Sequence, residues 1–195
     1  MLGAFIGDLA ATTWEKDKAK FFSLLVMEKA MPSAYGHSLL ASANFMLDIN
    51  EQEKIDIQEG VACDSLEFKG KWLMWRIAAI WLAPYENAHL HQFAHIGKEE
   101  EEAALFVSQL IQSLLRGATK SQAFHGVDGV ESKIKNSDFK NLQANGNLLT
   151  YVYRAWDSFY RSFDFTSAIH NAMMWSGDKH LLACITGAIA EAMYG

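Results

Sequence analysis

The sequence predicts an all-α fold: one compact domain of orthogonally packed helices. The chain of 195 residues contains only two prolines, Pro32 and Pro84, so few positions interrupt a helix by removing a backbone donor. Apolar residues recur at helical spacing in several segments. No segment alternates polar and apolar residues over a length that requires a sheet. We therefore expect residues 1–195 to form a single multi-helix domain.

The clearest helical pattern runs from Lys98 to Arg116. Its apolar residues fall on one helix face; they are Ala103, Val107, Leu110, Ile111 and Leu114. The acidic run 99–102 suits the positive end of the helix dipole, and Gly117 suits a left-handed cap after the last turn. The sequence thus predicts both the helix and its two ends.

Further helices are predicted on both sides of this segment. One follows Pro32 and Ser33, with Ser33 as a candidate N-cap. The others cover residues 71–82, 149–161, 166–175 and 179–193. In the final helix we expect a stripe of apolar residues to face the core: Leu181, Leu182, Ile185, Ile189 and Met193.

A stretch of weaker pattern separates these helices between Ala118 and Asn147. It contains Gly126, Gly129 and Gly146 and few sustained apolar repeats. We predict an irregular segment there.

Charge and composition exclude several classes of function. The net charge of −6 provides no positive field for nucleic acid or anionic lipid. No apolar run approaches the roughly 20 residues that cross a bilayer, and residues 1–11 lack the positively charged leader of a signal peptide. Cys63 and Cys184 form no CxxC pair. We expect a soluble, cytoplasmic protein that binds neither nucleic acid nor membrane.

Four segments carry a resemblance to a known family, and they occur in the family's order. Gly7–Glu15 resembles the motif GDxxGxxxE, and Ser176–Ala188 resembles GGDxDTxAAxxGA. Gly70–Ile80 is similar to GNGAAMRxxPI, and Ala94–Glu100 is similar to THxHPEA. On these motifs, and on the run 157–168 before the last one, the chain resembles the ADP-ribosylglycohydrolase family, of the dinitrogenase-reductase-activating glycohydrolase type. The resemblance implies the helical fold of that family.

The resemblance also implies a chemistry: hydrolysis of ADP-ribose from modified side chains with two magnesium ions. Magnesium takes oxygen ligands, yet Tyr35–Leu40 stands where the family has TDDTxL, and only Ser38 keeps an oxygen there. In the late motif Asp178 remains, while His180 stands at the second aspartate position. A two-magnesium centre is therefore doubtful in this chain.

The histidines at these aspartate positions suggest a different metal. The family fold would bring His37 and Ser38 beside Asp178 and His180, a donor set that suits a single transition metal such as zinc. The alternative is that these are isolated histidines. Asp178 has its own simpler interpretation as the N-cap of the last helix.

Catalytic and ligand-binding candidates also come from the resemblance. Asp8 and Glu15 of the first motif are the candidate catalytic residues, with Glu15 placed to activate or position water; alternatively, Glu15 belongs to a solvated face. The candidate ligand-binding residues lie in the middle segments: Trp72, Trp75, Arg76 and His95. The two tryptophans could stack on an adenine or fill the cleft instead.

Three functions stay open at this point. The first is hydrolysis of an N- or O-glycosidic ADP-ribose linkage with an altered or impaired metal centre. The second is an inactive pseudoenzyme that binds a ligand or partner through the former active-site cleft that the resemblance implies. The ligand would be nucleotide-like, such as ADP-ribose, and the partner would be a protein, such as an ADP-ribosylated protein. The third is a helical interaction module without inherited chemistry. The sequence does not predict an oligomeric state.

Overall fold

The computed structural model describes residues 1–16, 30–47, 65–82, 97–127 and 147–195, and the secondary structure in this part of the chain consists of helices, without a strand. The prediction of an all-α class is confirmed for these residues. In chain order the helices are α1 (Leu2–Lys16), α3 (Ala34–Leu47), α4 (Leu66–Leu82), α5 (Lys98–Leu115), α6 (Lys120–His125), α8 (Leu148–Tyr160), α9 (Phe165–Met173) and α10 (Lys179–Tyr194).

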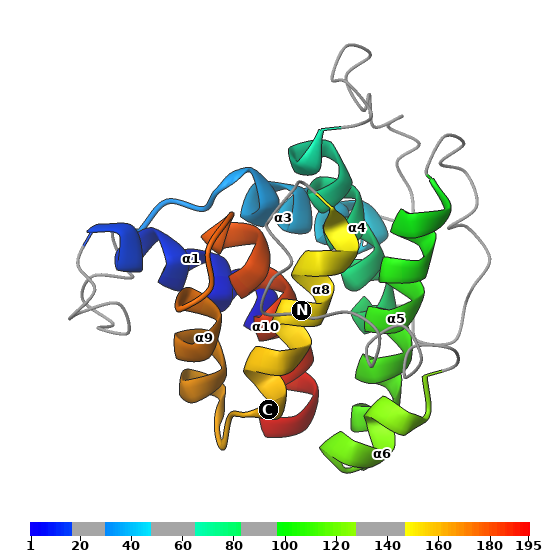
Figure 1. The fold of residues 1–195 in the computed structure, drawn as a ribbon. Coiled ribbons are helices and arrows are strands. Elements are labelled where there is room, and N and C mark those ends of the chain that lie inside the picture. Colours follow the sequence, from blue (N-terminus) through cyan, green and yellow to red (C-terminus); the bar gives the residue numbers. More distant parts are fainter. Residues whose placement is uncertain (17–29, 48–64, 83–96, 128–146) are drawn as a thin grey trace.

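Helix α10 lies at the centre of the arrangement (Figure 1) and packs against α1, α5, α8 and α9. Every residue from Leu181 to Ala190 is buried, as expected for a helix that is surrounded by others. Helix α3 packs mainly on α4 and also touches α1. The first turn of α10 therefore lies where α1 and the start of α3 come together.

Small residues allow α1 and α10 to approach very closely. A Cβ atom at Gly7 would lie 2.2 Å from the carbonyl oxygen of Ala183, and one at Gly187 would lie 2.0 Å from that of Gly3. Glycine at these positions leaves the space that the opposing backbone occupies. This close contact fixes the side chains of α1 against those of α10.

The sequence predicted most helix boundaries well. Helix α5 begins at Lys98 and ends at Leu115, with Arg116 as its cap and Gly117 at φ +86°. The N-cap predictions are also confirmed, since the Ser33 hydroxyl accepts from the backbone N–H of Tyr35 and the Asp178 carboxylate accepts from that of Leu181. Helix α4 begins at Leu66, earlier than predicted.

Three details differ from the predictions. Helix α1 was not predicted, and α6 lies inside the stretch expected to be irregular, where Thr119 and Gln122 form a capping box. A six-residue helix is too short to give a periodic signal. Met193, expected in the core, is 42% exposed because it lies in the last turn of α10, after the buried stretch 181–190.

Membrane crossing was not expected from the sequence. None of the helices in the described ranges is both long enough and apolar enough to span a bilayer.

Candidate functional site

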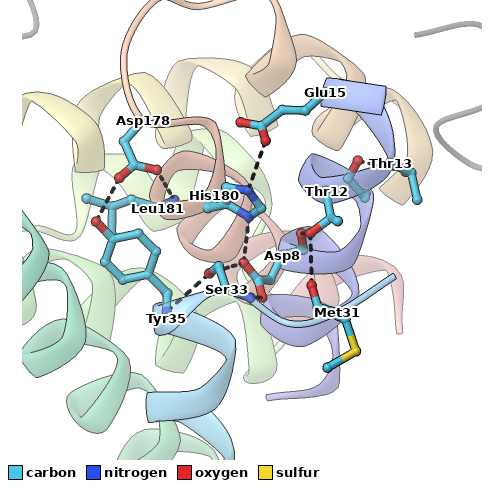
Figure 2. Close-up of polar contacts among 11 residues, drawn as sticks. Asp8, Thr12, Thr13, Glu15, Met31, Ser33, Tyr35, Asp178, His180 and Leu181 are labelled. Atoms are coloured by element: carbon cyan, nitrogen blue, oxygen red, sulfur yellow. Dashed lines mark hydrogen bonds and ion pairs between the residues drawn. The ribbon is translucent and has the colours of Figure 1, made fainter. Parts of the chain in front are cut away.

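A carboxylate, that of Asp8, is buried where α1, α10 and the segment before α3 meet (Figure 2). Asp8 has no exposed surface. Its Oδ2 accepts the backbone N–H of Ser33 at 2.8 Å, and its Oδ1 accepts both the Ser33 hydroxyl at 2.5 Å and Nδ1 of His180 at 2.9 Å. Burying a charge is costly unless it is hydrogen-bonded and paired, and these three donors meet that requirement.

The His180 ring lies between two carboxylates of α1 (Figure 2). While Nδ1 donates to Asp8, Nε2 lies 3.6 Å from Oε2 of Glu15. Asp8 and Glu15 are seven positions apart on one helix, which places them on the same face two turns apart. The hydrogen bond to Asp8 raises the pKa of His180; burial opposes this, and the negative charges of Asp8, Glu15 and Asp178 raise the pKa further.

The two carboxylates differ in their access to water. Asp8 is fully buried, whereas the Glu15 side chain is 57% exposed. The imidazole thus connects a buried anion to an anion at the surface. We call Asp8, Ser33, His180 and Glu15 the Asp8–His180 site.

Beside this site, the carboxylate of Asp178 is held by groups of the protein itself. Its Oδ1 caps α10 through the N–H of Leu181 at 3.0 Å, and its Oδ2 accepts the Tyr35 hydroxyl at 2.7 Å. Burial and the charge of Asp178 raise the pKa of Tyr35, so the phenol stays protonated and donates. The Tyr151 hydroxyl accepts the backbone N–H of Asp178 at 2.9 Å.

Cys184 lies one turn after His180 and is fully buried. Burial, and then the charges of Asp8 and Asp178, raise the pKa of its thiol well above the ordinary value. Cys184 is therefore a small buried residue and not a nucleophile, because a thiolate nucleophile needs a lowered pKa.

The predicted metal ligands are only partly brought together. His180 and Asp178 lie near each other, but His37 is exposed on α3 and the Ser38 hydroxyl donates to the carbonyl oxygen of Lys71 at 3.2 Å. Within the described ranges, no group of three or more His, Cys, Asp or Glu side chains is arranged to hold a metal ion. The transition-metal hypothesis has no geometric support in these residues.

Of the predicted ligand-binding residues, Trp72, Trp75 and Arg76 lie on α4. Trp72 is buried in the hydrophobic core and Arg76 lies 5.6 Å from the centre of its ring. For Trp72 this favours the interpretation that the indole fills space. Trp75 is partly buried, and His95 lies outside the described residues.

Sequence reasoning missed Ser33 and Tyr35 as partners of the two carboxylates. Ser33 was noted only as a helix cap, and Tyr35 only as a residue that replaces a ligand. No local signal could reveal their partners, since Ser33 lies 25 positions from Asp8 and Tyr35 lies 143 positions from Asp178.

Comparison of the chain with known family models, with curated proteins and with solved structures found no match.

Proposed function

We propose that the protein is an ADP-ribosylglycohydrolase-like hydrolase that cleaves an N- or O-glycosidic bond at C1 of the ribose, with Glu15 as its base. One observation carries this proposal: the exposed Glu15 carboxylate lies 3.6 Å from an imidazole whose other nitrogen is held by the buried Asp8. Perturbed, interacting titratable groups at a surface are a physical sign of a catalytic site. The motif Gly7–Glu15 supplies the class of substrate.

In the proposed reaction, Glu15 takes a proton from water while the water oxygen bonds to C1 of the ribose. The bond from C1 to the acceptor nitrogen or oxygen breaks, and the acceptor takes a proton from solvent. Asp8 holds the imidazole of His180 in one orientation, and a protonated imidazole holds the Glu15 carboxylate in place. Because Glu15 is exposed, it returns its proton to solvent.

Two magnesium ions, which the resemblance implies, do not fit these residues. Both oxygens of Asp178 are engaged within the protein, and Tyr35 and Gly36 stand where the resemblance places oxygen ligands. Magnesium requires several oxygen ligands in octahedral geometry. No step of the proposed reaction therefore involves magnesium.

The test measures release of ADP-ribose from peptides that are ADP-ribosylated on arginine or on serine. Glu15→Gln should lower the rate on the order of 100-fold or more, the scale of a lost general base. Glu67→Gln is a matched control, because Glu67 is also exposed, at 58%, and also forms an ion pair, with Lys71. Equal rates for Glu15→Gln and the parent protein, or no turnover by the parent, would refute the hydrolase proposal.

A second candidate, ligand binding without turnover, is favoured by the state of Asp178. A carboxylate with both oxygens bonded to Tyr35 and Leu181 is stable without any ligand, as expected for a site that has lost its reaction but kept its fold. Calorimetry with ADP-ribose should then give a saturable heat although the parent protein releases no ADP-ribose. If ADP-ribose gives no heat up to millimolar concentration, binding of a protein partner is the form of this second candidate that remains.

A further inference from the structure

Ser33 contributes more to the Asp8–His180 site than helix capping requires. Its backbone N–H donates to Oδ2 of Asp8 at 2.8 Å and its hydroxyl donates to Oδ1 at 2.5 Å. Ser33 therefore supplies two of the three donors already described for this buried carboxylate, and His180 supplies the third.

The position of Ser33 is itself fixed on both sides. Its hydroxyl oxygen accepts the backbone N–H of Tyr35 at 3.1 Å. Before it, the Thr12 hydroxyl of α1 donates to the carbonyl oxygen of Met31 at 3.1 Å, which holds the segment leading into α3 against α1 (Figure 2). A hydroxyl that accepts along one direction has its proton free to point along another, here toward Asp8.

The Ser33 hydroxyl and Nδ1 of His180 donate to the same oxygen, Oδ1 of Asp8. Two donors on one oxygen compete for its negative charge, and each weakens the other. We propose that Ser33 is a positioning residue of this site: by sharing Oδ1 it sets the strength and direction of the Asp8–His180 hydrogen bond, and through the ring it sets where Glu15 is held. The effect on turnover rests on the proposed function, whereas the effect on the hydrogen bond does not.

Nuclear magnetic resonance can measure this hydrogen bond directly, through the proton bound to Nδ1 of His180 at one fixed pH, assigned by its absence in His180→Gln. Ser33→Ala removes the competing donor, so the remaining bond should shorten and the resonance should move downfield. Ser33→Gly should give the same shift, and it preserves helix capping to within about a few tenths of a kcal/mol, so it serves if Ser33→Ala does not fold. Ser33→Thr keeps the hydroxyl and should restore the parent resonance.

Ser42→Ala is the matched control. Ser42 is a buried serine of α3, the helix that Ser33 caps, and its hydroxyl donates to the carbonyl oxygens of Ser38 and Leu39, not to Asp8. The control should leave the resonance in place. In the hydrolase assay, Ser33→Ala and Ser33→Gly should lower kcat on the order of tenfold with KM nearly unchanged, the expected result of a displaced catalytic group.

A resonance that is unmoved in both Ser33→Ala and Ser33→Gly, or that Ser33→Thr fails to restore, overturns the positioning role. If the parent protein shows no turnover, the proposed hydrolase function fails, and the resonance still decides the role of Ser33.

Discussion

Helix α3 approaches Asp8 so closely that position 36 should accept only glycine. A Cβ atom at Gly36 would lie 2.2 Å from Oδ2 of Asp8 and 2.9 Å from Cβ of Pro32. Ordinary contacts are 3.4–4 Å, so Gly36→Ala must move α3 and the carboxylate apart by more than 1 Å. A displacement of that size breaks the 2.8 Å hydrogen bond from the backbone N–H of Ser33.

The expected loss of stability follows from these contacts. Overpacking costs about 1–3 kcal/mol, and a lost hydrogen bond to a charged group costs about 1.5–3 kcal/mol. The better helix propensity of alanine offsets about 1 kcal/mol. We expect Gly36→Ala to lower the free energy of unfolding by about 1.5–5 kcal/mol.

Urea unfolding followed by circular dichroism measures this change, provided that the slope against urea is the same in both proteins. Gly126→Ala is a suitable control, because Gly126 has a φ of −77° and the nearest atom to a Cβ there lies 3.3 Å away, so that a shift of about a tenth of an ångström restores ordinary contact. The control should change stability by less than about 0.5 kcal/mol. A Gly36→Ala protein as stable as the parent would show that α3 does not press on Asp8 as described.

Other parts of the structure give further predictions. The pKa of His180 is raised in the folded protein. The contribution of His180 to the free energy of unfolding is therefore complete below its pKa in the unfolded chain, about 6.5, and is lost as the pH rises through the folded pKa. The difference in unfolding free energy between the parent and His180→Gln should thus be larger at pH 6 than at pH 9, and an equal difference at both would contradict this. Tyr35→Phe removes the donor to Asp178 and should cost about 1–2 kcal/mol in urea unfolding, whereas Tyr160→Phe, at an exposed tyrosine, should cost almost nothing. Gly187→Ala would place a Cβ atom 2.0 Å from the carbonyl oxygen of Gly3 and should lower the free energy of unfolding by about 1–3 kcal/mol. A thermal midpoint equal to that of the parent would be inconsistent with the close α1–α10 contact.

The motifs selected some of the residues of the candidate site, but their assigned roles depended on the resemblance. Asp8, Glu15, Asp178 and His180 were all candidates from sequence, and the structure brings the first two together with His180. The predicted association of His180 with His37 is not seen, since His37 is exposed. Asp178 and His180 thus lie near each other without forming, among the described residues, the ligand set that the resemblance implies.

The sequence by itself determined the helical class and most helix ends, because apolar spacing, capping residues and glycine stops act within a few positions of the chain. The ends of α5 and the caps at Ser33 and Asp178 are of this kind. Only the tertiary structure decided that Ser33 donates to Asp8 and that Tyr35 donates to Asp178. Those contacts form only where α1, α3 and α10 pack against one another. Glycines on these helices make the close packing possible, and the atoms they approach belong to residues far away in the sequence.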